Sequence, residues 1–276
     1  MDEDRRVGAL LREWRTRRKL SQLELSIRSG ISARHISFVE TGRTIPSHAM
    51  IERFTEHLNI PLRERNRLLI AAGHAPTYRQ RPLYDPDLAE AGAAVRRVMA
   101  AQEPYPALAL DRHWNLLFAN TAAEIFSHTV RGALLEPPIN MMRLGLHPDG
   151  FAPRVRNLAQ VRGFLLPRLA RQAAHTGDPE LAALHEELSH YATDTDPVRI
   201  DPADVALTIQ LRHRGMDLSL FSTITTFGAA FDVTLDEITV ESFFPADAAT
   251  ADYLHALARD TSDRAAALAD PSGSSR

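Results

Sequence analysis

The side chains best suited to chemistry near the start of the chain lie between residues 21 and 43, in the sequence SQLELSIRSGISARHISFVETGR. An arginine guanidinium presents its donors in a planar fork, so Arg34 can pair with both acceptors on the edge of a guanine. Gln22 and Ser37 add neutral hydrogen-bonding groups, and Arg43 adds a second cation. Such a set suits phosphate oxygens and base edges, which predicts contact with DNA.

The charge distribution agrees with this prediction. The 276 residues have a net charge of -3, yet residues 1–80 hold 15 Arg and Lys against 9 Asp and Glu, a net of +6. Residues 81–276 hold 17 against 26, a net of -9, so the two parts account for the total. A basic first part followed by an acidic remainder indicates either that the first part meets a polyanion or that it has a solvated basic face, and the motif has to decide.

Helices must position these side chains. Apolar residues at i, i+3, i+4 and i+7 predict an amphipathic first helix: Val7, Leu10, Leu11 and Trp14. Ser21 and Glu24 form an S-x-x-E capping box that predicts the start of a second helix, and Gly30 predicts its end. Ser32 predicts the start of a third helix, which ends near residues 41–42.

Two further helices complete the predicted first domain, residues 1–74. One places four apolar residues on a single face: Met50, Ile51, Phe54 and Leu58. The other opens near Pro61 and ends at Gly73. Five helices predict an all-α domain, and the second and third, joined by a tight glycine turn, predict a helix-turn-helix.

The run SQ-x-E-L, followed after eight residues by R-H-I-S-x-V-E-x-G-R-x-x-P, resembles the XRE-type (phage-repressor-like) helix-turn-helix family. The resemblance covers the first 70 residues and implies a regulator that binds double-stranded DNA as a homodimer. It implies that Gln22 and Arg43 contact phosphates. It also implies that Ala33, Arg34 and Ser37 project into the major groove.

Some of these residues keep more than one interpretation. Ala33 either touches a thymine methyl or only leaves room, and Arg34 is otherwise a surface charge. His35 is expected at the same surface, where it faces solvent, a phosphate or a base. Arg15 and Glu40 match a family pair that forms a salt bridge inside the domain. Because an unpaired carboxylate facing DNA would repel the phosphates, we interpret Glu40 as structural.

The rest of the chain predicts a second domain of the α+β class. Residues 75–87 contain three prolines and are predicted to form an extended linker. The domain is expected at residues 88–262, and residues 263–276 are expected to form a disordered tail. Helices are expected at 88–102, at 179–191 and at 248–259. Another helix is expected to begin at the capping box Thr121/Glu124, and a further one is expected to kink or end at Pro167. Strands are expected at 107–110, 115–119, on both sides of a turn at 214–215, and at 235–244, giving an antiparallel or mixed sheet of about five strands.

Four stretches resemble the MmyB-like ligand-binding domain, which follows XRE-type domains in bacterial regulators: the junction LLIAAGHAP, then EPYPALALDRHWNLLFAN, MMRLGLHPDG and STITTFGAAFDVTLDEITVESFFPADAAT. The resemblance spans residues 69–257. It implies a PAS-like fold with a buried pocket, and some members of the family are associated with fatty-acid-like ligands.

Aromatic residues near the predicted sheet either fill a core or line such a pocket: Trp114, Phe118, Phe164, Phe221, Phe227, Phe231 and Phe243. Arg143 and His147 lie four residues apart and either hold a ligand carboxylate or form an internal salt bridge, for example with Asp149. Alternatively, the second domain is a protein-interaction or dimerisation module with a filled core and no small ligand.

The sequence lacks the patterns of several other classes. With no cysteine it has neither disulfides nor a thiol nucleophile. In HEELSH the histidines are five residues apart instead of four, so they do not share the helix face of a metalloprotease site. We therefore expect no catalytic residues, metal or cofactor, and interpret the acidic segment 193–204 as a solvated loop. The absence of a signal peptide or an apolar run of about 18 residues predicts a cytoplasmic protein.

Overall fold

The computed structural model describes residues 7–130, 132–191 and 207–269, with only the backbone of residues 262–269. The chain divides into two compact units. The first comprises Met1–Asp85 with Gln172–Asp178 and Gly228–Asp236, and the second comprises Pro86–Arg171, Pro179–Phe227 and Glu237–Arg276. The division after Asp85 falls within the predicted linker, residues 75–87.

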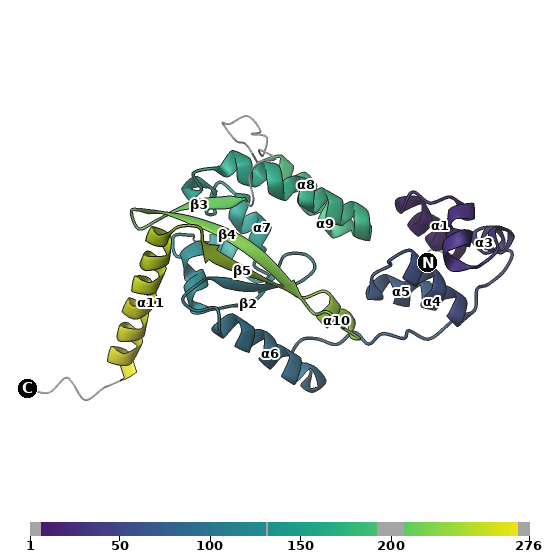
Figure 1. Cartoon of the computed structure of the whole chain (residues 1–276), viewed down its shortest axis with the longest axis horizontal. Coiled ribbons are helices and arrows are strands. Elements are labelled where there is room, and N and C mark those ends of the chain that lie inside the picture. The colour runs from purple at the N-terminus through teal and green to yellow at the C-terminus, as the bar shows by residue number, and fades with distance from the viewer. Residues whose placement is uncertain (1–6, 131, 192–206, 270–276) are drawn as a thin grey trace, which may run out of the picture. The chain divides into compact units, whose positions relative to one another are not determined.

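The five predicted helices of the first unit are present: α1 (Val7–Arg17), α2 (Gln22–Ser29), α3 (Ala33–Glu40), α4 (His48–His57) and α5 (Leu62–Ala71) (Figure 1). Ser21 and Glu24 form the predicted capping box, and Gly30 ends α2 with a φ of 67°. The Ser32 hydroxyl accepts a hydrogen bond from the backbone N–H of His35 and so caps α3. Local capping therefore places the recognition helix where the sequence predicts it.

One apolar core joins the five helices, and it includes Trp14, Leu25, Ile36, Phe54 and Leu69. All five side chains are at most 4% exposed. Burial of this kind contributes about 1.5–3 kcal/mol for each large apolar side chain. The core therefore holds α3 rigidly against the rest of the unit.

Gly8 sets the distance between α1 and α3. A Cβ atom at this position would lie 2.1 Å from the carbonyl oxygen of Val39. No other residue type fits without movement of one helix, because the obstructing atom belongs to the backbone. The close approach of α1 to α3 thus requires glycine, which has no side chain, at position 8.

The second unit contains a five-stranded sheet with strand order β2-β1-β5-β4-β3. Its strands are β1 (Ala107–Leu110), β2 (Leu116–Ala119), β3 (Thr208–His213), β4 (Met216–Thr226) and β5 (Thr239–Pro245). All neighbouring strands are antiparallel. The predicted five-stranded sheet is confirmed, and of the two predicted types it is the antiparallel one.

Helices lie on both sides of this sheet (Figure 1). The helices that follow α5 in the chain are η1 (Pro86–Leu88), α6 (Ala89–Ala100), η2 (Thr121–Phe126), η3 (Gly132–Leu135), α7 (Met141–Leu146), η4 (Ala152–Arg154), α8 (Leu158–Thr176), α9 (Pro179–Ser189), α10 (Val233–Asp236) and α11 (Ala248–Ala269). α6 packs on β1 and β5, whereas α11 packs on β4 and β5. α10 falls within the first unit.

The capping box predicted at Thr121 and Glu124 does not form. Asn120 is the N-cap residue and makes no side-chain cap hydrogen bond, and residues Thr121–Phe126 form a 3-10 helix. The reason is a contact from outside the segment, because the Glu103 carboxylate accepts the backbone N–H of Thr121 at 2.8 Å. A tertiary hydrogen bond therefore replaces the local one.

Three other predicted boundaries are wrong. Of the kink or end expected at Pro167, the end is wrong, because α8 continues through Pro167 to Thr176; the burial of Val161 and Leu169 on either side offsets the hydrogen bond that proline lacks. The predicted strand 235–244 begins only at Thr239, because α10 occupies residues before it. The predicted helix 248–259 runs on to Ala269, so residues 263–269 are helical where a disordered tail was expected. Residues 270–276 and the acidic segment 193–204 lie outside the described residues.

Candidate DNA-binding surface and ligand-binding cavities

The start of α3 carries the residues predicted to meet DNA. Arg34 is exposed, while Ala33, His35 and Ser37 are partly buried. The Nε2 atom of His35 is buried and has no hydrogen-bond partner among the described residues. In this conformation His35 presents that nitrogen to the protein interior, so Arg34 is the main exposed donor of the group.

Phe38 organises the two predicted DNA-binding arginines. The guanidinium of Arg34 lies 5.3 Å from the centroid of the Phe38 ring, and that of Arg43 lies 5.7 Å from it. The backbone N–H of Arg43 also donates to the Phe38 carbonyl at 2.8 Å. Cation–π contacts at exposed sites contribute about 0.5–1 kcal/mol each. Phe38 therefore holds both cations at one surface, a role that the sequence analysis missed.

Glu40 lies at the centre of a hydrogen-bonded group beneath α3. Arg15 donates to both of its carboxylate oxygens, at 2.6 and 2.9 Å. Gln22 donates from its side-chain amide to the same carboxylate at 2.8 Å. The hydrogen bond to Glu40 is the largest cause of the raised pKa of Arg15. Glu40 of α3 is thus joined to α1 through Arg15, as predicted, and to α2 through Gln22.

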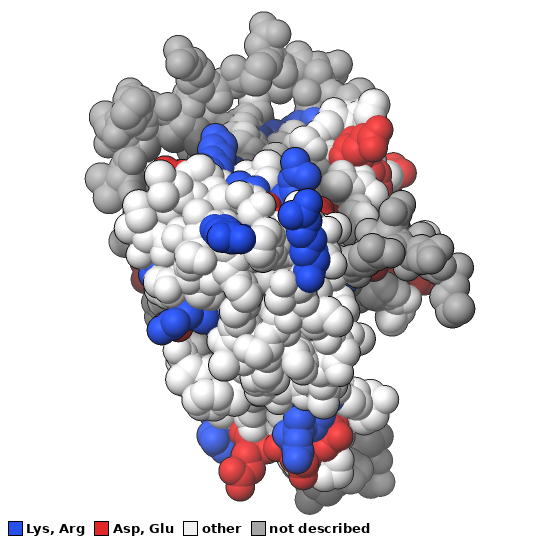
Figure 2. All heavy atoms as spheres, turned by 90° about the vertical axis from the view of Figure 1, so that its right-hand side faces the viewer, with Lys and Arg blue, Asp and Glu red and all other residues white. Residues whose placement is uncertain are grey.

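Basic side chains are dispersed over this part of the surface. Figure 2 shows the side on which α3 lies in Figure 1, where separate Lys and Arg side chains stand on a largely uncharged surface. Acidic side chains gather toward its margins in this view. Attraction to DNA would therefore come from a few discrete arginines and not from a dense basic patch.

A small apolar cavity of about 70 Å³ lies on one face of the sheet in the second unit. It is lined by Leu108, Trp114, Phe126, Met141, Met142, Gly145, Leu146, Phe151, Val155, Val161, Leu165, Ile209, Glu241 and Phe243. Two of the predicted ligand-binding residues, Trp114 and Phe243, belong to this lining. The cavity is smaller than the roughly 150 Å³ that holds a benzene molecule.

Glu241 is the one ionisable residue in that lining. Burial raises the pKa of its carboxyl group, while the hydroxyl of Ser222 and the charge of Arg168 oppose this shift. The guanidinium of Arg168 lies 4.7 Å from the ring centroid of Trp114. The sequence analysis missed Glu241 and Arg168. In the strand sequence VESFF, side chains alternate between faces, so Glu241 shares a face with Phe243. This alternation could have identified Glu241 from the sequence.

The remaining aromatic residues predicted as ligand contacts lie outside the lining of this cavity. The guanidinium of Arg96 lies 4.3 Å from the ring centroid of Phe118. Phe221 stacks on Phe244. Phe164 is 37% exposed, Phe231 is 82% exposed, and Phe227 is partly buried. These side chains contribute to packing or to the surface.

Arg143 and His147 do not reach the apolar cavity either. Arg143 forms a bidentate salt bridge with Glu187 of α9, at 2.6 and 2.7 Å, which lowers the pKa of Glu187. The backbone N–H of Asp149 donates to Nδ1 of His147 at 3.0 Å. Nδ1 must then be unprotonated, so the 3.8 Å contact with the Asp149 carboxylate is not an ion pair. Both residues have internal partners.

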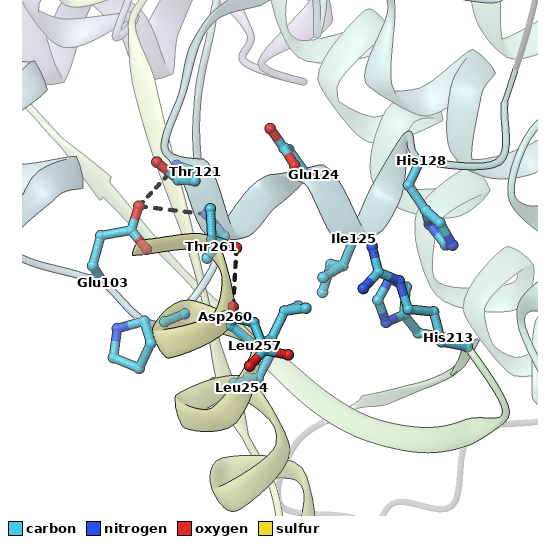
Figure 3. A pocket seen from close by; sticks show the side chains of 14 residues that line it. Glu103, Thr121, Glu124, Ile125, His128, His213, Leu254, Leu257, Asp260 and Thr261 are labelled. Atoms are coloured by element: carbon cyan, nitrogen blue, oxygen red, sulfur yellow. Dashed lines mark hydrogen bonds between the residues drawn. The ribbon is translucent and has the colours of Figure 1, made fainter. Parts of the chain in front are cut away.

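A second and larger cavity, of about 450 Å³, lies between η2, the turn from β3 to β4, and α11 (Figure 3). Its lining is mixed: Glu103, Pro104, Thr121, Ala122, Glu124, Ile125, His128, His213, Arg214, Leu254, Leu257, Ala258, Asp260 and Thr261. This volume is within the range of about 300–1,000 Å³ typical of small-molecule sites.

Residues 91–257 match the family model described as the MmyB-like transcription regulator ligand binding domain, which covers more than half of the chain. The chain belongs to the MmyB-like transcription regulators. Residues 6–68 match a helix-turn-helix domain model, in agreement with α1–α5. No curated protein matches this MmyB-like regulator.

The two matches show a transcription regulator with a DNA-binding domain followed by a ligand-binding domain. Neither matched family is a family of enzymes. Among the residues that the structure describes, no helix of this MmyB-like regulator combines the length and apolarity needed to cross a bilayer.

Proposed function

We propose that this MmyB-like regulator binds a specific DNA sequence as a homodimer and that a small apolar, fatty-acid-like ligand in its second unit alters that binding. The observation that carries the DNA part is the exposed pair Arg34 and Arg43, whose guanidinium groups both lie within 6 Å of the Phe38 ring centroid. Two copies of α3 would enter the major groove at half-sites about 34 Å apart.

The roles of the DNA-contacting residues follow from their chemistry and positions. Arg34, at the exposed start of α3, would read a guanine through two hydrogen bonds. Ala33 and Ser37 would lie against neighbouring bases, and Arg43, just past the helix, would meet a phosphate. Gln22 would contact a phosphate through the second hydrogen of its amide nitrogen, because the first is donated to Glu40.

Ligand binding would require the small cavity to expand, since about 70 Å³ is far below the volume of a long acyl chain. Met141 and Met142 are suited to this, because methionine side chains are flexible and adapt to irregular spaces. A carboxylate head near Glu241 would be tolerated only while Glu241 is protonated, as two ionised carboxylates repel each other. Coupling to DNA affinity through residues 75–87 would be worth about 1–3 kcal/mol.

Native mass spectrometry of the purified protein tests this proposal. A ligand-bound form should show a mass excess that is lost on denaturation, and the released molecule can be identified. The variant Val161→Phe, which places a ring in the cavity, should abolish the excess. Val98→Phe, at a position 44% exposed on α6, should retain it. The same spectra distinguish monomer from dimer.

A second function is favoured by the small volume of the apolar cavity. A filled core would make the second unit a protein-interaction or dimerisation module without a small ligand. An apo mass, with no effect of added fatty acids on DNA affinity, would support this alternative. DNA binding measured by fluorescence anisotropy on a selected operator would be unaffected by that outcome, so the two parts of the proposal are tested separately.

A further inference from the structure

The larger cavity has a basic side and an acidic side with an apolar strip between them. In Figure 3, His128 and His213 stand on one side of the cavity and Glu103 on the other, while Asp260 lies with Leu254 and Leu257 on α11 between them. Leu257 and its neighbours on α11 lie between the two sides. The two histidines are therefore separated from Glu103 across the cavity, while Glu124 and Asp260 lie between them.

On the basic side, donors gather without an acidic partner. Arg154 lies 3.2 Å from Nδ1 of His128 and can only donate, so Nδ1 accepts and Nε2 carries the hydrogen. The ring of His213 lies 4.2 Å from that of His128, and Arg214 follows it in the turn. Among the described residues, none of these four groups has a carboxylate within salt-bridge distance. Such a group of donors suits an anion.

His213 has one ring nitrogen engaged within the protein and the other available to the cavity. It is only 2% exposed, and its Nδ1 pairs with the hydroxyl of Tyr253 at 2.7 Å. Its other nitrogen, Nε2, has no hydrogen-bond partner among the described residues, although the residue lines the cavity. Burial and the neighbouring cations lower the pKa of His213 to about 4, so it stays neutral while the site is empty. A bound anion would reverse the effect of those cations.

The acidic side suits a cation. Glu103 is already engaged, because its carboxylate accepts backbone N–H groups of Thr121 and Ala122. Glu124 and Asp260 are exposed at the cavity and make no salt bridge among the described residues. An ammonium group placed between them would be held by two carboxylates.

We propose that this cavity binds an amphoteric small molecule, with its acid group at His128, His213 and Arg214 and its amine at Glu124 and Asp260. The short apolar body of such a molecule would lie over Ile125 and Leu257. This site is separate from the apolar cavity beside Glu241, and the inference does not depend on a fatty-acid-like ligand.

Matched probes of one length test both ends of the site. 6-Aminohexanoate carries both charges, hexanoate only the acid, and hexylammonium only the amine. We expect 6-aminohexanoate to bind at least ten-fold more tightly than either singly charged probe in isothermal titration calorimetry. In NMR titrations of the histidine imidazoles, it should raise the pKa of His213, because the acid group stabilises the protonated ring.

Charge-neutral variants test the named residues. Arg214→Gln and Asp260→Asn should each weaken 6-aminohexanoate binding at least ten-fold. The matched controls Arg212→Gln, on the same hairpin, and Asp252→Asn, on the same helix, lie outside the cavity lining and should stay within two-fold of the wild type. Unfolding midpoints of all four variants verify that the unit remains folded.

Three results would overturn the proposal. The first is that no probe up to 10 mM shifts the His213 signal, and the second is that a singly charged probe binds as tightly as 6-aminohexanoate. The third is that the cavity variants bind like their controls. Because these measurements use neither DNA nor fatty acids, their failure leaves the proposed function untouched.

Discussion

Replacing Glu40 by Gln should destabilise the first unit strongly, because Glu40 is the buried member of the pair that joins α1 to α3. The side chains of Glu40 and Arg15 are 2% and 13% exposed. Removing one partner of a buried ion pair costs about 3–5 kcal/mol, since the other charge is left uncompensated. Gln retains one acceptor, and Arg15 still donates to the carbonyl of Leu20, so we expect about 2–3 kcal/mol.

This loss is large for a domain of this size. A unit of some 70 residues has a stability of about 4–10 kcal/mol, and each kcal/mol shifts its melting temperature by about 4–8 °C. The midpoint should therefore fall by roughly 10–20 °C. DNA affinity at 37 °C should fall with it, because the unfolded unit no longer presents α3.

The two tryptophans make the assay selective. Trp14 is buried in the first unit and Trp114 in the second, and the chain contains no others. In a Trp114→Phe background, fluorescence therefore follows the unfolding of the first unit alone. Glu13→Gln is the matched control, because its salt bridge with Arg17 is exposed and contributes only about 0–1 kcal/mol. A Glu40→Gln midpoint no lower than that of Glu13→Gln would refute the reasoning.

Four further predictions concern single residues. Arg34→Ala should weaken binding and relax preference at one base pair by about 1–3 kcal/mol; an unchanged consensus in a selection experiment would exclude Arg34 as a base reader. Arg43→Ala should weaken all sequences alike and reduce the salt slope by about one unit, whereas an altered base preference would contradict a phosphate contact. Gly8→Ala should cost about 1–3 kcal/mol in denaturant unfolding, since its methyl group would meet a backbone oxygen of α3; a wild-type midpoint would show that α1 can move freely. The pKa of His213 is lowered to about 4 in the folded protein, so between about pH 4 and 6.5 the unfolded chain binds more protons than the folded one. The free energy of unfolding of the second unit should therefore decrease by about 2–3 kcal/mol as pH falls from about 6.5 to 4. His213→Gln should flatten this pH dependence, and an identical slope would contradict the assignment.

The recognition helix could be placed from sequence because its signals are local. Ser21 bonds to a residue three positions on, as does Ser32, and Gly30 adopts the left-handed turn that its lack of a side chain permits. Each interaction closes within one helical turn. The apolar periodicity of α1 likewise predicts which of its faces packs into the core.

Local signals were insufficient where a distant residue competes for the same group. At Thr121, the capping box lost its backbone N–H to Glu103. Arg143 could be identified as an anion-binding side chain, but its anion proved to be Glu187, 44 positions away in the chain. Pairings of this kind depend on which helices the fold brings together, and no periodicity records them.

The type and spacing of residues determined by themselves that the chain carries a helix-turn-helix and a sheet of about five strands flanked by helices, because both patterns arise from repeats of a few residues. Only the tertiary structure decided where space is left unfilled. The apolar cavity at Glu241 is small and the mixed cavity at His213 is large, although the sequence favours an apolar pocket. A cavity is what remains after side chains from several elements have packed, and its volume is therefore a property of the whole fold.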